Sequence, residues 1–301
     1  MLAFEMERPR SLAAAVEILG NHGSRAMIKA GGTDVLVWMR KHTVHPEMLV
    51  DLSEIPELGG ISFYPHKGIK IGAMATINQV AGHEDARRYY GALADACISH
   101  SDPLIRNKAT VLGNICASVP SGDMIPPFAA YEALLHIYGP EGERDIPFAD
   151  FITGPRKNIL SPGEIVTSAS LPLPKGRSSG CYLKLGRRNA LDLAQVGVAC
   201  VAVEGEKGRE YRLACGAVAP RPVRASEAED LLAGQSFPEG SLLEKAAKAA
   251  AAAVNPITDV RATREYRFSM VEELTKRAVS LCAGRLSDDG RPERDQGGKA
   301  S

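Results

Sequence analysis

The sequence carries no net charge, which excludes one large class of partners. Its 36 Lys and Arg residues are balanced by 36 Asp and Glu residues over 301 positions. No basic excess remains to neutralise a phosphate backbone. We therefore expect the protein to have no nucleic-acid partner.

Long apolar runs are absent as well. No run approaches the roughly 20 apolar residues that a membrane-spanning helix requires. The opening segment has Glu5 and Glu7 where a signal peptide would have a basic start and an apolar core. We expect no transmembrane segment and a cytoplasmic location.

Closely spaced cysteines are missing. The six cysteines form no Cys-x-x-Cys pair; they are Cys97, Cys116, Cys181, Cys200, Cys215 and Cys282. This scatter argues against a zinc ribbon or an iron–sulfur cluster within the chain. Most of these thiols lie in apolar segments, so we expect reduced cysteines in the core.

Other signatures of catalysis are also lacking. No Gly-x-Gly-x-x-Gly motif follows a predicted strand, so a Rossmann dinucleotide site is not indicated. The histidines show no ligand spacing apart from His42 and His45 in a polar stretch, and no hydrolytic triad assembles. We expect neither a metal ion nor a catalytic side chain.

Two glycine-containing stretches carry the functional signal that is present. The first, Lys-Ala-Gly-Gly-Thr-Asp-Val-Leu at residues 29–36, lies between an apolar entry at 26–28 and an amphipathic run at 35–39. It predicts a tight turn between a strand and a helix. Without Cβ atoms, Gly31 and Gly32 would let backbone N–H groups approach a phosphate closely. An ordinary turn with a helix N-cap is the alternative.

The second stretch, Thr-Val-Leu-Gly-Asn-Ile-Cys-Ala-Ser-Val-Pro-Ser-Gly-Asp at residues 110–123, again mixes small and polar residues. It lies directly before an apolar segment at 124–130. This composition favours a ligand-binding loop, and a polar connector broken by Pro120 is the alternative. If both stretches hold one ligand, that ligand lies in a cleft between the units that carry them.

The order of predicted elements divides the chain into three units and a tail. Residues 1–58 alternate helix and strand in a small βαβ-like unit, with Ser11 as the N-cap of a helix. Residues 59–175 form a larger α+β unit. Its predicted strands are 68–72, 134–138 and 163–167, and its predicted helices are 76–82, 86–99 and 124–130.

A passage rich in proline and glycine at 171–180 leads into the third unit, residues 178–285. There, an apolar hairpin precedes several helices; the strands are 196–203 and 210–218, and the helices lie near 225–233, 241–253 and 265–284. The tail at 286–301 has almost no apolar content, and we expect it to be disordered. The predicted fold class is α+β, two lobes followed by a domain of antiparallel strands and helices.

Across nearly its whole length the sequence resembles a known family. Together with the two stretches, segments at 105–110, 182–188, 216–225 and 259–267 are similar to those of the FAD-binding medium subunits of the molybdenum hydroxylases. That group includes the xanthine dehydrogenases, carbon monoxide dehydrogenase and 4-hydroxybenzoyl-CoA reductase. The matches run in family order over residues 1 to about 283, which is far more specific than either stretch alone.

The resemblance implies an FAD site assembled from both stretches. The first would surround the pyrophosphate, and the second would follow the ribityl chain, the pyrophosphate and the adenosine. The implicated residues are Lys29, Ala30, Gly31, Gly32, Thr33, Asp34, Val35, Thr110, Gly113, Asn114, Ala117, Ser118, Asp123, Val166 and Lys184. For Lys184, a solvated strand lysine is the alternative. His100 is either a helix-terminal histidine or a neighbour of the flavin.

The sequence also departs from the family pattern. Leu112 stands where the family usually has the first of two glycines, so we expect it at negative φ with its side chain near the flavin. Cys116 follows, and it is either close to the isoalloxazine or a small buried thiol. The inserted cluster-binding segment of the 4-hydroxybenzoyl-CoA reductase type is missing.

The activity that the resemblance implies is electron transfer as an oxidoreductase subunit. Electrons would come from a molybdenum-cofactor large subunit through the [2Fe-2S] clusters of a small subunit, reach FAD here, and leave to NAD⁺, a quinone or another acceptor. The expected assembly is a heterotrimer that can dimerise. A flavin-free assembly subunit of the same fold and a stand-alone flavoprotein oxidoreductase are the alternatives.

Overall fold

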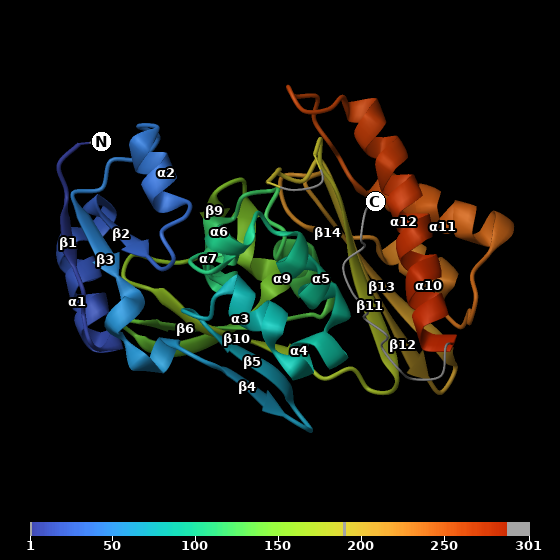
Figure 1. Cartoon of the computed structure of the whole chain (residues 1–301), viewed down its shortest axis with the longest axis horizontal. Coiled ribbons are helices and arrows are strands. Elements are labelled where there is room, and N and C mark those ends of the chain that lie inside the picture. Colours follow the sequence, from blue (N-terminus) through green and yellow to red (C-terminus); the bar gives the residue numbers. More distant parts are fainter. Residues whose placement is uncertain (1, 189–190, 288–301) are drawn as a thin grey trace.

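Residues 2–188 and 191–287 are described by a computed structural model of the chain (Figure 1). The predicted disordered tail therefore lies almost entirely outside the described residues. Within them, helices and strands form three units that follow one another from left to right in Figure 1. No helix of these residues is both long enough and apolar enough to cross a membrane.

The first unit is a three-stranded parallel sheet in the order β1-β3-β2. Its elements are β1 (Glu5–Glu7), α1 (Leu12–His22), β2 (Ala26–Lys29), α2 (Val35–Arg40) and β3 (Met48–Asp51). The helix α1 begins where predicted, because the hydroxyl of Ser11 accepts from the backbone N–H of Ala14. The short 3₁₀ turns Gly23–Arg25, Leu52–Glu54 and Pro56–Leu58 complete the unit. The predicted βαβ-like arrangement is present.

The second unit centres on a five-stranded antiparallel sheet in the order β4-β5-β10-β6-β7. The strands are β4 (Ile61–Tyr64), β5 (Gly68–Gly72), β6 (Leu134–Gly139), β7 (Gly142–Pro147) and β10 (Ile165–Pro172). A two-stranded hairpin, β8 (Ile152–Gly154) and β9 (Lys157–Asn158), stands apart. The helices are α3 (Ile77–Gly82), α4 (Glu84–Tyr89), α5 (Gly91–Ser99), α6 (Pro103–Arg106), α7 (Val111–Ala117), α8 (Ile125–Ala130) and α9 (Phe148–Phe151).

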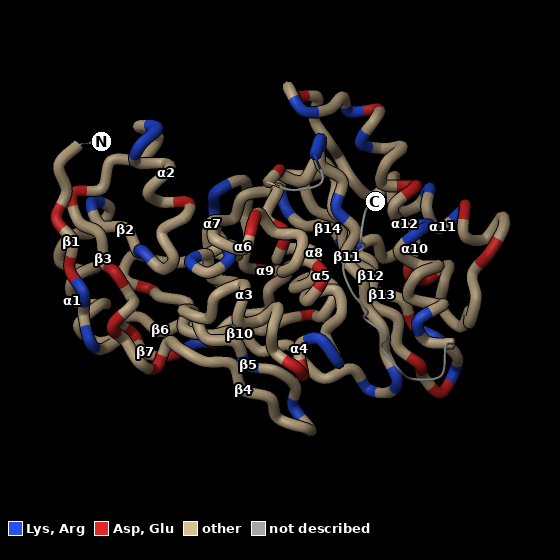
Figure 2. Tube along the Cα trace, in the orientation of Figure 1, with Lys and Arg blue, Asp and Glu red and all other residues tan. Residues whose placement is uncertain are grey.

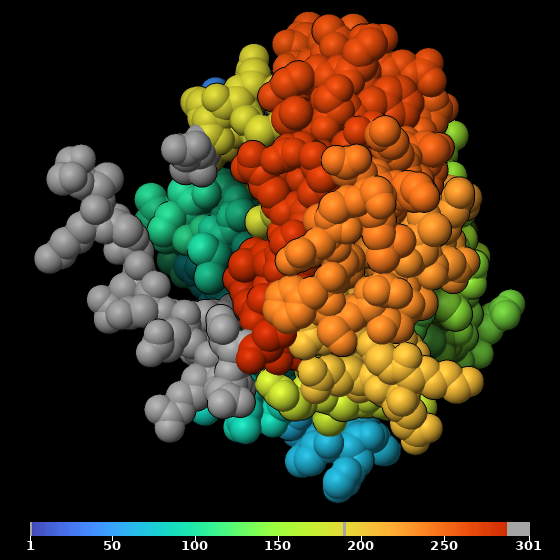
Figure 3. Space-filling model, turned by 90° about the vertical axis from the view of Figure 1, so that its right-hand side faces the viewer, coloured from blue at the N-terminus to red at the C-terminus, as the bar shows by residue number. Residues whose placement is uncertain are grey.

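The third unit is a four-stranded antiparallel sheet covered by three helices. The strands β11 (Ser178–Leu185), β12 (Val196–Gly205), β13 (Gly208–Gly216) and β14 (Val223–Arg224) pair in chain order. Figure 3 shows the helices α10 (Ser226–Leu232), α11 (Gly240–Ala253) and α12 (Arg264–Ser287) spread over the outer face. Buried alanines of α11, among them Ala246 and Ala250, permit close packing against the neighbouring helices.

The sheet of the third unit is buried on both faces, and this joins the units. Along β12, Ala199 and Val201 belong to the core shared with the second unit, whereas Val198 and Cys200 face the helices. Because strand side chains alternate between faces, a strand buried on both sides is apolar without interruption. This explains the continuous apolar run in the sequence. The predicted α+β class is confirmed.

Two differences from the expected elements have a physical cause. The expected helix over 86–99 is divided at Tyr90, whose buried hydroxyl accepts from the N–H of Ile69 and donates to the carbonyl of Leu171. The strand β7 was not predicted because it is a mostly exposed edge strand of charged residues, which shows no apolar periodicity. Tertiary contacts thus decided both features.

Candidate functional site

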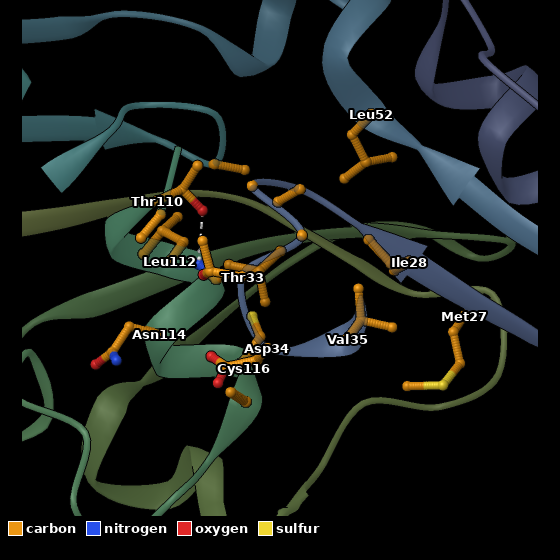
Figure 4. A pocket seen from close by; sticks show the side chains of 18 of the residues that line it. Met27, Ile28, Thr33, Asp34, Val35, Leu52, Thr110, Leu112, Asn114 and Cys116 are labelled. Carbon is orange, nitrogen blue, oxygen red and sulfur yellow. Dashed lines mark hydrogen bonds between the residues drawn. The ribbon is translucent and has the colours of Figure 1, made fainter. Parts of the chain in front are cut away.

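The two glycine-containing stretches meet in one cavity of about 250 Å³ (Figure 4). One wall is the turn between β2 and α2, and the other is the helix α7. Most of the implicated residues line it: Ala30, Gly31, Gly32, Thr33, Asp34, Val35, Thr110, Gly113, Asn114, Ala117 and Val166. A cavity that one ligand shared by both stretches would need is therefore present between the first two units.

The turn after β2 depends on its two glycines for different reasons. Gly32 has φ of 80°, a left-handed conformation in which a Cβ is strained. At Gly31, a Cβ would lie 1.9 Å from the carbonyl oxygen of Lys108, just before the second stretch. The absence of a side chain at Gly31 is therefore what lets the two stretches pack against each other.

Free backbone donors gather in this turn. The N–H groups of Gly31, Gly32, Thr33 and Asp34 donate no hydrogen bond to any residue that the structure describes. Successive unpaired amides lining a concave surface form a site that suits an anion such as a phosphate. The hydroxyl of Thr33 and the amide nitrogen of Asn114 are further polar groups in the cavity without a described partner.

The first half of the second stretch is the helix α7, and only its second half, residues 118–123, is the loop that the composition suggested. The hydroxyl of Thr110 accepts from the N–H of Gly113 at 3.0 Å and caps α7, and Ser118 ends it at a φ of 50°. A Cβ at Gly113 would lie 2.6 Å from that hydroxyl oxygen. Leu112 lies inside α7 with negative φ, as expected, and its buried side chain lines the cavity.

The cavity is apolar away from the two turns. Met27 and Ile28 of β2, Leu52 and Leu160 line it, with Val166 of β10. Cys116 of α7 also faces it, and burial raises the pKa of this thiol to about 12. The thiol therefore stays protonated near neutral pH. Such a surface suits one face of a planar ring.

A second cavity of about 260 Å³ adjoins the first and shares five residues with it: Thr33, Asp34, His100, Asn114 and Ala117. Asp123 lines this second cavity rather than the first. Residues of the third unit, such as Leu193, also contribute to its wall. The two cavities together extend from the β2–α2 turn to the third unit.

Asp123 is held by three side chains from two units. Its Oδ1 accepts from the hydroxyl of Tyr182 at 3.0 Å, and its Oδ2 lies 3.0 Å from Nζ of Lys184 and 2.9 Å from Nδ1 of His100. Burial raises the pKa of Tyr182, and the charge of Asp123 adds to the rise, so the phenol remains a donor. Lys184 also donates to the carbonyl of Ser99. Lys184 is thus a buried partner of Asp123, in contrast to a solvated strand lysine.

The remaining implicated residues lie away from the first cavity. Lys29 turns back to Asp51, with its Nζ 2.9 Å from Oδ2. Ser118 is buried, and its hydroxyl donates to the carbonyls of Ile115 and Cys116. Lys184 lines a separate hollow of about 300 Å³ together with Leu185.

His100 was not among the implicated residues, although it lines both cavities. It is the C-cap of α5. Its position in the site becomes evident only from the structure, where its Nδ1 contacts the carboxylate of Asp123. Its position before the segment at 105–110 was the one signal in the sequence that pointed to it.

The carboxyl group of Asp34 is a polar group in the cavities without a hydrogen-bond partner. It neither caps α2 nor contacts a described donor. Burial raises its pKa above the ordinary value of an aspartate, and electrostatic interactions with His100 and Arg156 oppose that rise. An ordered ligand offering a hydroxyl would supply the missing donor.

Family models account for nearly the whole chain. A model described as the FAD-binding domain in molybdopterin dehydrogenase matches residues 2–174, and one described as the CO dehydrogenase flavoprotein C-terminal domain matches residues 181–281. The chain is 33% identical over 276 residues to the putative xanthine dehydrogenase FAD-binding subunit of Escherichia coli K12, covering 91% of this chain and 94% of that protein.

Carbon monoxide dehydrogenases are similar in both sequence and structure. The medium chain from Hydrogenophaga pseudoflava is 31% identical over 285 residues, which cover 94% of this chain and 98% of that protein. A solved structure of that organism's enzyme has a TM-score of 0.90 at 32% identity, covering 95% of this chain and 99% of that one. The structure of quinoline 2-oxidoreductase from Pseudomonas putida 86 has a TM-score of 0.88 at 26% identity, covering 95% of this chain and 98% of that one.

The packing at Gly31 predicts a specific loss of stability. We expect Gly31→Ala to lower the free energy of unfolding by about 1–3 kcal/mol, because the methyl group would collide with the Lys108 carbonyl. Urea denaturation of the purified chain measures this. The control is Gly20→Ala in α1, where no atom lies within 4 Å of the added methyl group. Equal stability of the two variants would contradict the proposed contact.

The raised pKa of Asp34 predicts a pH-dependent gain in stability. Its folded-state pKa exceeds the unfolded value, so the contribution of the neutral acid is present at low pH and is lost as pH rises through the folded pKa. We therefore expect Asp34→Asn to unfold at a higher temperature than the parent at pH 7 and at the same temperature near about pH 3. The exposed Asp150→Asn is the control and should show no such trend. A gain that does not depend on pH would refute this explanation.

Proposed function

The chain belongs to the family of FAD-binding medium subunits of the molybdenum hydroxylases, an oxidoreductase family, and on this premise we propose how it holds the cofactor and where its electrons come from and go. FAD lies along the two adjoining cavities, with its diphosphate at the β2–α2 turn. The chain takes electrons from the [2Fe-2S] clusters of a partner subunit and passes them to NAD⁺, a quinone or another acceptor.

The observation that carries the cofactor assignment is the row of free N–H groups at residues 31–34, which line the cavity together with residues of α7. A diphosphate has many acceptor oxygens and two negative charges, so it matches donors that nothing else in the chain uses. The glycines there keep side chains out of the way. The free N–H groups, the volume of the two adjoining cavities and the small residues at the turn all fit FAD.

The individual residues take different roles in this proposal. The turn residues, Ala30, Gly31, Gly32, Thr33 and Val35, surround the diphosphate from one side, and Thr110, Gly113, Asn114 and Ala117 of the capped helix do so from the other. Asp34 accepts from a ribose hydroxyl. Val166, with the apolar residues around it, covers a ring and excludes water. FAD, when bound, supplies the redox chemistry, and the protein supplies position and electrostatics.

Four implicated residues support the site without facing the first cavity. Lys29 is tied to Asp51 at the end of β3, which fixes the strand that leads into the turn. Ser118 anchors the end of α7. Asp123 and Lys184 form the buried ion pair on which the second cavity's wall is built, and any contact of theirs with FAD would be made from that cavity.

The partners that we propose follow from the same premise. A large subunit with the molybdenum cofactor performs the hydroxylation, and a small subunit with [2Fe-2S] clusters relays the electrons. The three subunits form a heterotrimer that can dimerise, in the cytoplasm. The substrate of the complex is chosen by residues of the large subunit.

Flavin content tests the cofactor site. We expect Gly32→Val to abolish or strongly reduce the absorption of the purified chain at roughly 450 nm, because a β-branched residue is strained at positive φ in the diphosphate turn. Asp123→Ala should also lower this absorption, because Asp123 lines the second cavity. Gly82→Val, in open space at the end of α3, is the control. Wild-type flavin content in both site variants would refute the assignment, and a colourless parent would favour a flavin-free assembly subunit.

Isolation of the native complex tests the partners. We expect a tag on this chain to recover two further polypeptides, with molybdenum and about four irons per FAD by metal analysis. Recovery of a yellow chain alone, active as an oxidoreductase, would instead identify a stand-alone flavoprotein.

A further inference from the structure

An aspartate, a histidine and a serine form a hydrogen-bonded row on the five-stranded sheet of the second unit. Nδ1 of His136 lies 2.7 Å from Oδ1 of Asp145, and its Nε2 lies 2.7 Å from Oγ of Ser170. The same three groups, in the same order, activate a serine hydroxyl in hydrolases of unrelated folds. No hydrolytic triad was expected from the sequence, because three different strands supply these residues.

The register of the strands brings the three residues together. His136 of β6 is directly opposite Asp145 of β7. On its other side, His136 is opposite Ser168 of β10, and Ser170 lies two residues further along that strand. Side chains of opposed and diagonal neighbours on one face of a sheet are within reach of each other. Strand pairing, rather than a flexible loop, therefore fixes the geometry of the row.

The row lies on the face of the sheet that is turned away from the core. Leu135 and Ala169, which adjoin its members along β6 and β10, belong to the buried core, and strand side chains alternate between faces. The side chain of His136 is 24% exposed and that of Asp145 is 55% exposed. Figure 2 shows acidic residues at β7, the edge strand of this sheet. A reactant in solution can therefore reach the row.

The aspartate decides which nitrogen of the imidazole ring accepts a proton. An ionised carboxylate only accepts, so Nδ1 of His136 donates its hydrogen to Asp145. In the neutral ring, Nε2 then has a free lone pair and accepts from the hydroxyl of Ser170. In this arrangement a histidine can remove the proton while the serine oxygen attacks an electrophile. Asp145 acts through His136 and is a positioning residue.

A cation lies beside the serine. Lys70 of β5 is directly opposite Ser170, and on its other side it is opposite Ser62 of β4. The ammonium group of Lys70 makes no ion pair or hydrogen bond with any residue that the structure describes. A positive charge beside an attacked carbonyl group stabilises the oxyanion that forms there. Ser62 shares this lysine but has no histidine partner among the described residues, which makes it a matched comparison.

We propose that Ser170 is a nucleophile that takes an acyl group from small activated esters, with His136 as its general base. The serine oxygen attacks the carbonyl carbon while its proton moves to Nε2 of His136. The C–O bond of the ester then breaks, and the leaving oxygen takes the proton from His136. Water attacks the acyl-serine in the same way, which releases the carboxylic acid and restores the hydroxyl group.

The substrate class follows from the openness of this face. None of the cavities described above includes a member of the row. Because no pocket orients the substrate, its reactivity has to come from its own leaving group. Aryl esters and acyl phosphates meet this requirement. The activity is separate from the proposed electron transfer, since no member of the row lines the cavities assigned to FAD.

The test exposes the full chain, with its bound flavin, to p-nitrophenyl acetate. We expect release of p-nitrophenol, with one acetyl group that peptide mass mapping places on Ser170. Ser170→Ala should remove that acetyl group, and His136→Gln should slow acetylation about a hundredfold, since it removes the general base. Asp145→Asn should slow it about tenfold by losing the charged hydrogen bond to the ring, and Asp145→Glu should restore most of the rate.

The controls use the neighbours of Ser170 on the same face. Ser62→Ala should be acetylated at the parent rate, because Ser62 has no histidine to take its proton. Lys70→Gln should slow the reaction by about tenfold without moving the acetyl group to another residue. Thermal unfolding of each variant verifies its fold. Mapping on the parent chain decides the question even where a variant does not fold.

Three outcomes would overturn the proposal: a parent chain whose Ser170 stays unmodified, an acetyl group on Lys70 or Ser62 in place of Ser170, or acetylation of His136→Gln at the parent rate. A chain that holds no flavin would count against the proposed function alone. The mapping of the acetyl group remains decisive in that case, because the row lies outside the cavities assigned to FAD.

Discussion

The buried carboxylate of Asp123 is the contact on which the architecture of the site depends. Its two oxygens receive Tyr182 and Lys184 from β11 and His100 from the end of α5. A buried carboxylate is costly unless it is paired and hydrogen-bonded, so its position is well defined only when the third unit is docked. The second cavity has part of its wall from that unit. Docking therefore shapes the candidate site.

A second constraint is steric and acts between the first two units. The backbone of Gly31 packs against the carbonyl group of Lys108, and any side chain at residue 31 would collide with that group. This contact sets the distance between the β2–α2 turn and the residues that lead into α7, and the turn with its unpaired amides lines the cavity. The same glycine that would permit a phosphate to approach the backbone is thus also needed for the two stretches to meet.

Much of the fold could be predicted because local patterns agreed with the tertiary structure. Ser11 caps α1, the run at 68–72 is β5, and the alanine-rich segment is α11. The failures lie where long-range contacts override local preference. Tyr90 divides one helix because its hydroxyl serves two strand-end backbone groups, and α7 forms where small polar residues suggested a loop.

By itself the sequence determined the family, the α+β class and the two stretches that line the first cavity, because glycine turns, caps and apolar periodicity are encoded locally. Tertiary structure alone decided that Asp123 pairs with both Lys184 and His100 and that Lys29 turns back to Asp51. These are contacts between residues far apart in the chain. Side chains acquire such partners only when packing brings their elements together, and the spacing of residues along the chain does not indicate which elements will pack.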